Sequence, residues 1–324
     1  MSSPAPVVVR DLVRTFRGKT GEIRAVDGLS FEVRPGTLFG LLGPNGAGKT
    51  TTLRILTTLL APTSGYVRVA GFDPLREGFA VRRSIAAVLQ DNASEQFLSV
   101  RDNFLCYARL HGQPGREAER RLPAVVERFG LTAVLGEKAA DLSIGMRRRV
   151  QVAKVFLLDS PILFLDEATT GMDPLVKREV IERIREVARE GRTVVLTTQN
   201  MDEAERLCDE ILIVARGHAV ARGDVETVKR LHAPLLEVRV SFEEPPEGLT
   251  EFLAGYHPAA TAFQDGRLTV SLPGSRRDAA TLLAALAARY RVADFEVASA
   301  SLEDAFLEAI AGPAKSAEVP EEER

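Results

Sequence analysis

A short glycine-rich stretch near residue 45 has the residue types and spacing of a phosphate-binding loop. It follows an apolar run at 38–42, precedes a helical pattern at 49–60, and consists of Gly43, Pro44, Asn45, Gly46, Ala47, Gly48, Lys49 and Thr50. Glycines let several backbone N–H groups turn toward one phosphate chain, and a helix N-terminus attracts the same anion. Lys49 can neutralise the outer phosphates, and the Thr50 hydroxyl can bind Mg²⁺. A chance match is expected in only about 1% of chains of this length, so the sequence predicts a nucleotide phosphate site.

Two adjacent acids, Asp166 and Glu167, follow the apolar run at 162–165. Neighbouring side chains of a strand point to opposite faces, so the two carboxylates are expected to have different roles. Asp166 is predicted to hold Mg²⁺ directly or through water. Glu167 is predicted to orient or deprotonate an attacking water. Solvated acids at a strand end are the plainer interpretation, which the phosphate loop in the same predicted sheet disfavours.

The first two thirds of the chain alternate short β-branched runs with helical patterns, which indicates a mostly parallel sheet covered by helices. Buried strands are predicted at 38–42, 162–165 and 193–198, and a helix at 174–190. Proline near the first turn of this helix and Gly191 after its end mark its limits. The polar segment 92–141 is expected to be an inserted helical subdomain.

The pattern changes near residue 232. Strands are predicted at 235–242, 259–263, 267–272 and 292–298, and helices at 248–255, 276–290 and 301–311. The β-α-β-β-α-β order indicates a small ferredoxin-like domain. The predicted organisation is therefore a nucleotide-binding domain at 1–232 with helical insertion at about 92–160, an α+β domain at 235–312, and a disordered acidic tail at 313–324.

Composition limits the possible partners. The chain has 324 residues and a net charge of −3, so no overall positive field favours nucleic acid or an anionic membrane. We expect no signal peptide, because residues 1–9 lack a basic start and a long apolar core. The sequence contains no run of 18 or more apolar residues, the length that a helix needs to span a bilayer. Cys106 and Cys208 are expected to be buried thiols rather than a disulfide or zinc site.

With these motifs in place, residues 7–223 resemble the nucleotide-binding subunit of ABC transporters. The resemblance implies an α/β P-loop NTPase core of ABC type that binds ATP and Mg²⁺, with Thr51 also in the nucleotide site. It implies that Gln90 contacts Mg²⁺ and the membrane partner, and that Phe16 stacks on adenine, although a strand-end phenylalanine is often plain core. Leu142, Ser143, Ile144, Gly145 and Met146 occupy the place of the family's Leu-Ser-Gly-Gly-Gln signature. Asp173 occupies the aspartate position of the loop after the catalytic acid.

Two positions depart from the family pattern. Gln199 follows the strand at 193–198, where the family has a histidine, and an amide can hydrogen-bond the terminal phosphate but cannot carry charge near neutral pH. Ile144 replaces a glycine of the signature, which predicts a weakened but usable contact. The residues around Gln199, the Gly-Met-Arg-Arg-Arg run and the end segment at 301–308 resemble the daunorubicin-resistance branch of drug exporters. A solvated face is the default expectation for Arg147, Arg148 and Arg149, and pairing with ATP or an acid of an opposite monomer is the alternative.

The resemblance implies an ATPase that dimerises around two ATP, with itself or with a paired ATPase subunit, and energises a separate integral membrane permease. The expected location is peripheral, on the cytoplasmic face of the cell membrane, with export of a lipophilic, drug-like compound as the task and no nucleic acid partner. The residues expected to carry catalysis are Lys49, Glu167 and Gln199. Two alternatives stay open: a soluble ABC ATPase acting on ribosomes or DNA, and a nucleotide-gated subunit that hydrolyses ATP only weakly.

Overall fold

The computed structural model describes residues 4–18, 21–89, 95–232, 235–264, 266–273, 276–299 and 301–311. The chain divides into two compact units after Asp224, and each unit is described separately below. Gln90 and the predicted acidic tail at 313–324 lie outside the described residues.

The first unit is built on a six-stranded sheet in the order β5-β6-β7-β3-β8-β9. The strands are β5 (Ile85–Val88), β6 (Ile162–Asp166), β7 (Thr193–Thr198), β3 (Leu38–Leu42), β8 (Glu210–Ala215) and β9 (His218–Gly223). All pairs are parallel except β8–β9. Every residue of β3, β6, β7 and β8 is buried, as expected for apolar runs covered on both faces. The predicted parallel sheet is confirmed.

A second, antiparallel sheet has the order β2-β1-β4, with β1 (Val7–Gly18), β2 (Gly21–Val33) and β4 (Ser64–Val69). Its inward-facing residues share one apolar cluster with β3 and α1 (Lys49–Leu56). Within this cluster Phe31 of β2 stacks on Phe39 of β3, with ring centroids 5.4 Å apart. Helix α1 ends four residues earlier than the sequence predicts. The chain turns there because Thr58 adopts a left-handed conformation with φ 69°.

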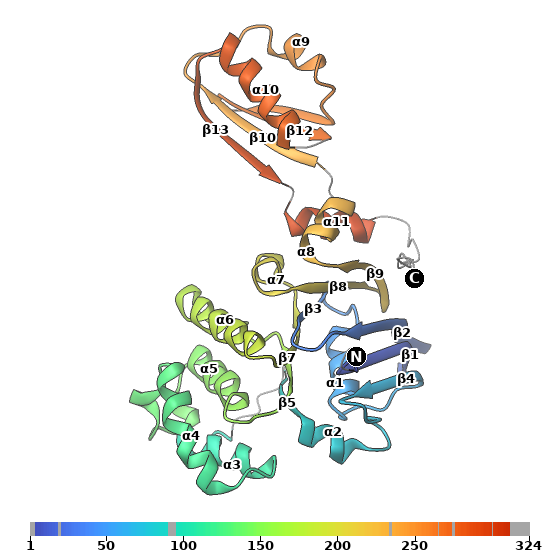
Figure 1. Cartoon of the computed structure of the whole chain (residues 1–324), viewed down its shortest axis with the longest axis vertical. Helices are drawn as coiled ribbons and strands as arrows, with labels where there is room; N and C mark the ends of the chain where they lie inside the picture. Colours follow the sequence, from blue (N-terminus) through green and yellow to red (C-terminus); the bar gives the residue numbers. More distant parts are fainter. Residues whose placement is uncertain are drawn as a thin grey trace. The chain divides into compact units, whose positions relative to one another are not determined.

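Helices cover the sheet (Figure 1). They are α2 (Gly78–Ser84), α3 (Val100–Leu110), α4 (Gly115–Arg128), α5 (Ile144–Val155), α6 (Pro174–Arg189) and α7 (Met201–Leu207). Three of them, α3, α4 and α5, lie in the segment between β5 and β6. Two 3₁₀ turns, Thr132–Val134 and Ala139–Asp141, connect α4 to α5. Helix α3 packs on both α4 and α5, so the helices between β5 and β6 form one cluster. The limits of the predicted helical subdomain, about 92–160, stay a prediction.

The second unit contains the helices α8 (Val225–His232), α9 (Leu249–Ala254), α10 (Arg276–Arg289) and α11 (Leu302–Ala311). Its strands are β10 (Leu235–Phe242), β11 (Ala260–Gln264), β12 (Arg267–Pro273) and β13 (Val292–Ser299). They pair antiparallel in the order β11-β12-β10-β13, the sheet of a ferredoxin-like βαββαβ unit. Alternate residues of β10 and β12, including Val238 and Val270, pack against α9 and α10, where Leu253 and Leu282 are buried.

The division after Asp224 places α8 in the second unit, where it packs on α11. The sequence put this helix in the first domain, so the domain limits 1–232 and 235–312 stay a prediction. In the part of the chain that the structure describes, no helix is long and apolar enough to cross a membrane.

Candidate functional site

The phosphate-type loop lies at the carboxyl end of β3, between that strand and α1. Gly46 and Gly48 have φ of 79° and 106°, which glycine adopts without strain. The loop also presses against neighbouring backbone: a Cβ on Gly43 would lie 2.2 Å from the Val214 carbonyl oxygen, and one on Gly48 2.4 Å from that of Ala25. Glycine is therefore required here both by conformation and by space.

Lys49 begins α1 and folds back across the loop. Its Nζ donates to the carbonyl oxygens of Gly43 at 2.7 Å and Pro44 at 3.0 Å, and the residue is buried. Burial lowers the pKa of Lys49, and the carboxylates of Glu167 and Asp166 oppose that shift. The Lys49 ammonium therefore lies within a loop whose backbone conformation suits the binding of an anion.

Asp166 ends β6 and is fully buried. Its Oδ1 accepts hydrogen bonds from the hydroxyl of Thr50 at 3.2 Å and from that of Thr197 at 2.5 Å. Its Oδ2 is buried and has no hydrogen-bond partner among the described residues. A buried, half-satisfied carboxylate next to a threonine hydroxyl is the oxygen donor set that Mg²⁺ favours, so these residues fit the ion.

Glu167 follows Asp166 and leaves the strand with φ 46°, which is uncommon for a residue other than glycine. Its backbone N–H donates to the carbonyl oxygen of Thr197 at 3.1 Å and to the hydroxyl oxygen of the same residue at 3.2 Å. Thr197 therefore contacts both acids. Its hydroxyl donates to the Asp166 carboxylate, and its hydroxyl and carbonyl oxygens accept from the backbone N–H of Glu167. The two carboxylates have different surroundings: Asp166 is buried and Glu167 is half-buried.

Gln199 follows β7, and its side chain is exposed. Since β7 pairs parallel with β6 and Thr197 is the register partner of Asp166, Gln199 emerges from the same sheet edge as Glu167. Such an edge, at the carboxyl ends of parallel strands, is where ligands of open α/β sheets bind. The structure thus brings Lys49, Thr50, Asp166, Glu167 and Gln199 to one end of the central sheet.

The signature residues lie elsewhere on the unit. Ser143 caps α5, with its Oγ accepting from the Met146 N–H at 3.2 Å, and Ile144 is 73% exposed. Asp173 caps α6 and accepts from the N–H groups of Leu175 and Val176. No hydrogen bond or ion pair within the described ranges joins Ser143, Gly145 or Asp173 to the loop at 43–50. Their predicted contact with nucleotide, and that of Thr51, stays a prediction.

Phe16 lies in β1 and is 37% exposed. The guanidinium of Arg14 lies 4.6 Å from the centroid of its ring and covers one face. Stacking of adenine on this ring stays a prediction, as does the role of Gln90, which the structure does not describe.

The three arginines after the signature are not a solvated face. Arg147 donates to the carbonyl oxygens of Ala140 and Leu142, and Arg149 to that of Phe129. Arg148 is 9% exposed and donates to main-chain carbonyl oxygens at four positions, Leu89, Asp166, Glu167 and Ala168. Burial lowers the pKa of Arg148, and Asp166 and Glu167 oppose the shift.

The solvated-face interpretation is therefore wrong for Arg148, because its side chain turns inward within its own chain. Pairing of one of the three arginines with ATP or with an acid of an opposite monomer stays a prediction. A run of three like charges in an amphipathic helix carries no sign of which member is buried. A hint was available in Val152 and Val155, which lie four and seven residues after Arg148 on the same face of the helix and are buried.

The chain is similar in sequence to known proteins of one family. The model of the ABC transporter family matches residues 26–170. The chain is 33% identical to the daunorubicin/doxorubicin resistance ATP-binding protein DrrA of Streptomyces peucetius, over 97% of this chain and 96% of that protein. It is 42% identical to DrrA3 of Streptomyces coeruleorubidus over 209 residues, 64% of this chain and 66% of that protein. It is 36% identical to the Nod factor export ATP-binding protein I of Ralstonia nicotianae, over 82% of this chain and 88% of that protein.

Solved structures show the same fold. One is an ATP-binding subunit of an ABC transporter, with a TM-score of 0.64 and 29% identity over 69% of this chain and 92% of that one. Another is a dimeric ATP-binding cassette in a post-hydrolysis state, bound to ADP and phosphate, with a TM-score of 0.63 and 21% identity over 67% of this chain and 98% of that one.

Proposed function

The chain belongs to the ATP-binding subunits of ABC transporters, and we propose that it hydrolyses Mg²⁺-bound ATP to drive export through a separate membrane permease. The observation that carries the proposal is the buried Asp166. It accepts a hydrogen bond from Thr50 of the phosphate loop, and its second carboxylate oxygen has no hydrogen-bond partner among the residues that the structure describes.

ATP binding follows from the loop. We assign the phosphates to the backbone and side chains of Gly43, Pro44, Asn45, Gly46, Ala47, Gly48, Lys49, Thr50 and Thr51. The Lys49 ammonium, now bonded to two carbonyl oxygens of the loop, has a third hydrogen to donate and lies where the outer phosphates gather negative charge. Thr50, Asp166 and Gln90 are assigned to Mg²⁺, which supplies charge neutralisation on the phosphates when bound.

Hydrolysis requires a group that orients water and accepts its proton. Glu167 is assigned that role, because its carboxylate stands at the edge of the sheet beside the buried Asp166. Gln199 is assigned a neutral hydrogen bond to the terminal phosphate or the water, since its side chain is exposed at the same edge. Water attacks the terminal phosphorus, its proton passes to Glu167, and ADP leaves with the bridging oxygen.

Two copies, or this chain and a paired ATPase subunit, are proposed to enclose two ATP molecules. The support is that Ser143 and Gly145 make no hydrogen bond or ion pair with their own phosphate loop in the part of the chain that the structure describes, whereas Ile144 beside them is exposed. A signature helix with an exposed N-terminus can point at a phosphate bound by another chain. Asp173 and Phe16 complete the proposed site.

The permease is proposed to dock near Gln90 and the start of the helical subdomain, at the cytoplasmic face of the membrane. Apolar side chains are exposed there, with Phe97 at 86%, Leu110 at 81% and Phe79 at 69%. A pocket of about 480 Å³ between α2 and α3 is lined by Phe79, Arg82, Arg83, Arg109, Leu110, His111 and Gly112. Exposed apolar residues around a pocket suit an amphipathic helix of a partner.

The experiment is co-expression with the membrane protein encoded next to this chain, followed by membrane fractionation and ATPase assay. The transporter proposal expects membrane attachment that depends on the permease, lost in Phe97→Asp while ATP affinity is kept. If neither the membrane attachment nor the ATPase activity of the chain changes when the membrane protein is co-expressed, a soluble ABC ATPase acting on ribosomes or DNA is favoured.

A weakly hydrolysing, nucleotide-gated subunit is the second candidate. It is favoured by Gln199, which cannot take a proton, and by Ile144, which places an exposed side chain where backbone must approach phosphate. A turnover of ATP below about one per minute for the assembled transporter would favour it, since most enzymes work near 10 per second. We propose a lipophilic compound as cargo because the relatives named above are resistance and export proteins.

A further inference from the structure

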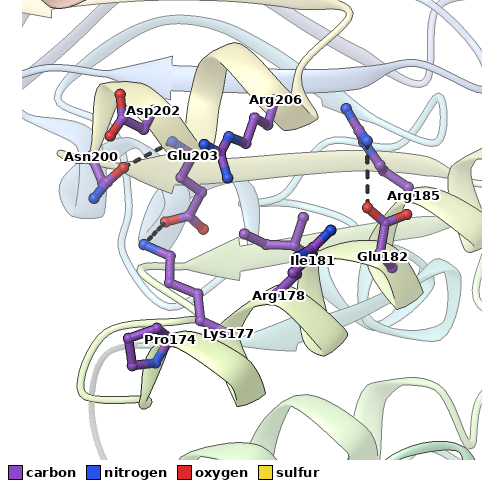
Figure 2. A pocket seen from close by; sticks show the side chains of 10 residues that line it. All are labelled: Pro174, Lys177, Arg178, Ile181, Glu182, Arg185, Asn200, Asp202, Glu203 and Arg206. Carbon is purple, nitrogen blue, oxygen red and sulfur yellow. Dashed lines mark hydrogen bonds and ion pairs between the residues drawn. The ribbon is translucent and has the colours of Figure 1, made fainter.

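A buried carboxylate lies near the nucleotide edge and has no part in the proposed reaction. Glu203, on the first turn of α7, is 6% exposed and points toward the start of α6 (Figure 2). Its carboxylate meets Lys177 of α6, whose Nζ lies 3.1 Å from Oε2. A buried carboxylate is costly unless it is paired and hydrogen-bonded, so the identity of its other partners matters.

Two of those partners come from segments that carry proposed catalytic groups, the loop after β6 and the end of β7. The hydroxyl of Thr169 lies 2.9 Å from each carboxylate oxygen of Glu203, and the hydroxyl of Thr198 lies 3.3 Å from Oε2. Thr169 is two residues after Glu167, and Thr198 immediately precedes Gln199. All three side chains are buried, so water does not compete for these hydrogen bonds.

A plain helix-capping role does not explain this arrangement. Asn200 caps α7 by accepting from the N–H of Glu203 at 2.8 Å, which makes Glu203 the third residue of the helix. In a capping box the acid at this position would reach back to the N–H of the capping residue. Here the N–H of Asn200 instead donates to the hydroxyl of Thr198 at 3.0 Å. The carboxylate of Glu203 is thereby left for Thr169, Thr198 and Lys177.

We propose that Glu203 is a positioning residue that holds Glu167 and Gln199 at a fixed separation through Thr169 and Thr198. The inference rests on the proposed ATPase activity. Charge-assisted hydrogen bonds to one buried anion fix the loop after β6 and the end of β7 to the same point, and the Lys177 ion pair compensates the charge of that anion. Since misplacing a catalytic group by about 1 Å can cost about 10²-fold in rate, loss of this anchor should lower turnover without affecting the phosphate loop.

The test compares Thr169→Val, which removes the hydroxyl at nearly constant shape, with Thr169→Ser, which retains it. Glu203→Ala and Glu203→Gln form a second pair, and Asp202→Asn is the control, since Asp202 is the exposed neighbour on the same turn. Measured are kcat, KM for ATP, the Kd of a non-hydrolysable ATP analogue, and the thermal midpoint of unfolding.

Thr169→Val and Glu203→Ala are expected to lower kcat by about 10-fold or more, with KM and Kd changed less than about 2-fold. Thr169→Ser and Asp202→Asn should retain wild-type kcat, and Glu203→Gln should fall between, because an amide oxygen still accepts from one hydroxyl. If Glu203→Ala does not fold, the Thr169 pair decides.

Equal kcat for Thr169→Val and Thr169→Ser would overturn the positioning role, as would parallel losses of kcat and analogue affinity. If the wild-type chain itself, with its permease, hydrolyses no ATP, the proposed function fails and the inference falls with it. The two failures are distinguished by the wild-type rate.

Discussion

The guanidinium of Arg148 donates to the carbonyl oxygen of Glu167 at 2.9 Å and to that of Asp166 at 2.6 Å. It thereby joins the helix that follows the signature to the strand end that carries both acids. The same side chain reaches the carbonyl oxygen of Leu89, next to Gln90. The buried guanidinium of Arg148 therefore contacts the backbone of two segments, the one next to Gln90 and the one that carries Asp166 and Glu167.

Replacing Arg148 by lysine should lower both stability and turnover. A lysine has three donors at a single point and cannot serve carbonyl oxygens from separate segments, so buried acceptors lose their partners. The free energy of unfolding should fall by about 1–3 kcal/mol, as measured by urea titration. Arg178→Lys, at an exposed position on α6, is the matched control and should leave stability within error. Equal stability of both variants would contradict the role assigned to Arg148.

Much of the first unit could be predicted because its signals are local. The loop at 43–50 needs glycine at fixed places, the segment at 162–165 is an apolar run, and the segment at 193–198 is rich in β-branched residues, as buried strands are. The predicted Leu235–Phe242 strand matches β10, and the predicted order of the second unit matches its elements, since turns and alternation mark each strand.

The contacts that hold the site together could not be predicted, because they join residues far apart in the chain. Arg148 and the carbonyl oxygen of Leu89 are 59 residues apart, and Thr169 and Glu203 are 34 apart. The valines of 144–155 hint at an inward face, but they do not show that Arg148, Gln151 and Lys154 are all buried. The early end of α1 at Leu56 depends on Thr58 adopting positive φ, which its residue type disfavours.

Gln199 predicts a simple pH–rate profile. An amide does not ionise, so no transition near about pH 6.5 in kcat should depend on this position. Gln199→His should introduce such a transition, measured as kcat between pH 5.5 and 9 at saturating ATP. Superimposable profiles for the two proteins would mean that residue 199 takes no part in the reaction.

Lys154 predicts a pH dependence of stability. Burial in α5 lowers its pKa to about 8, against the opposing effects of Cys106 and Glu95. Below about pH 8 both the folded and the unfolded chain bind the proton, and the penalty for the buried charge is complete. Between about pH 8 and 10.5 only the unfolded chain keeps the proton on Lys154. The cost of burying this charge therefore falls as pH rises, and the free energy of unfolding increases.

Lys154→Met should remove that dependence. The difference in unfolding free energy between variant and wild type should shrink from pH 8 to 10, by at most about 1.4 kcal/mol per pH unit. Urea titrations of both proteins at each pH measure it. A difference independent of pH would show that Lys154 is not buried with a lowered pKa.

The domain boundary can be tested with two truncated chains. Val228 of α8 is 1% exposed, and α8 packs on α11, so a chain ending at residue 232 carries α8 without its partner helix. A chain ending at Asp224 should therefore be the more soluble of the two and should bind ATP with little loss. The reverse order, measured by size-exclusion chromatography and ATP titration, would favour the limit at 232.

The most direct measurement is the turnover of Glu167→Gln. If Glu167 accepts the proton of the attacking water, the amide should lower ATP hydrolysis by about 10²-fold or more, with ATP affinity unchanged. Because bound ATP then persists, the variant should also elute as an ATP-dependent dimer, while the wild type does not in the presence of Mg²⁺. Hydrolysis near the wild-type rate in Glu167→Gln, with normal ATP binding, would contradict the account of this site.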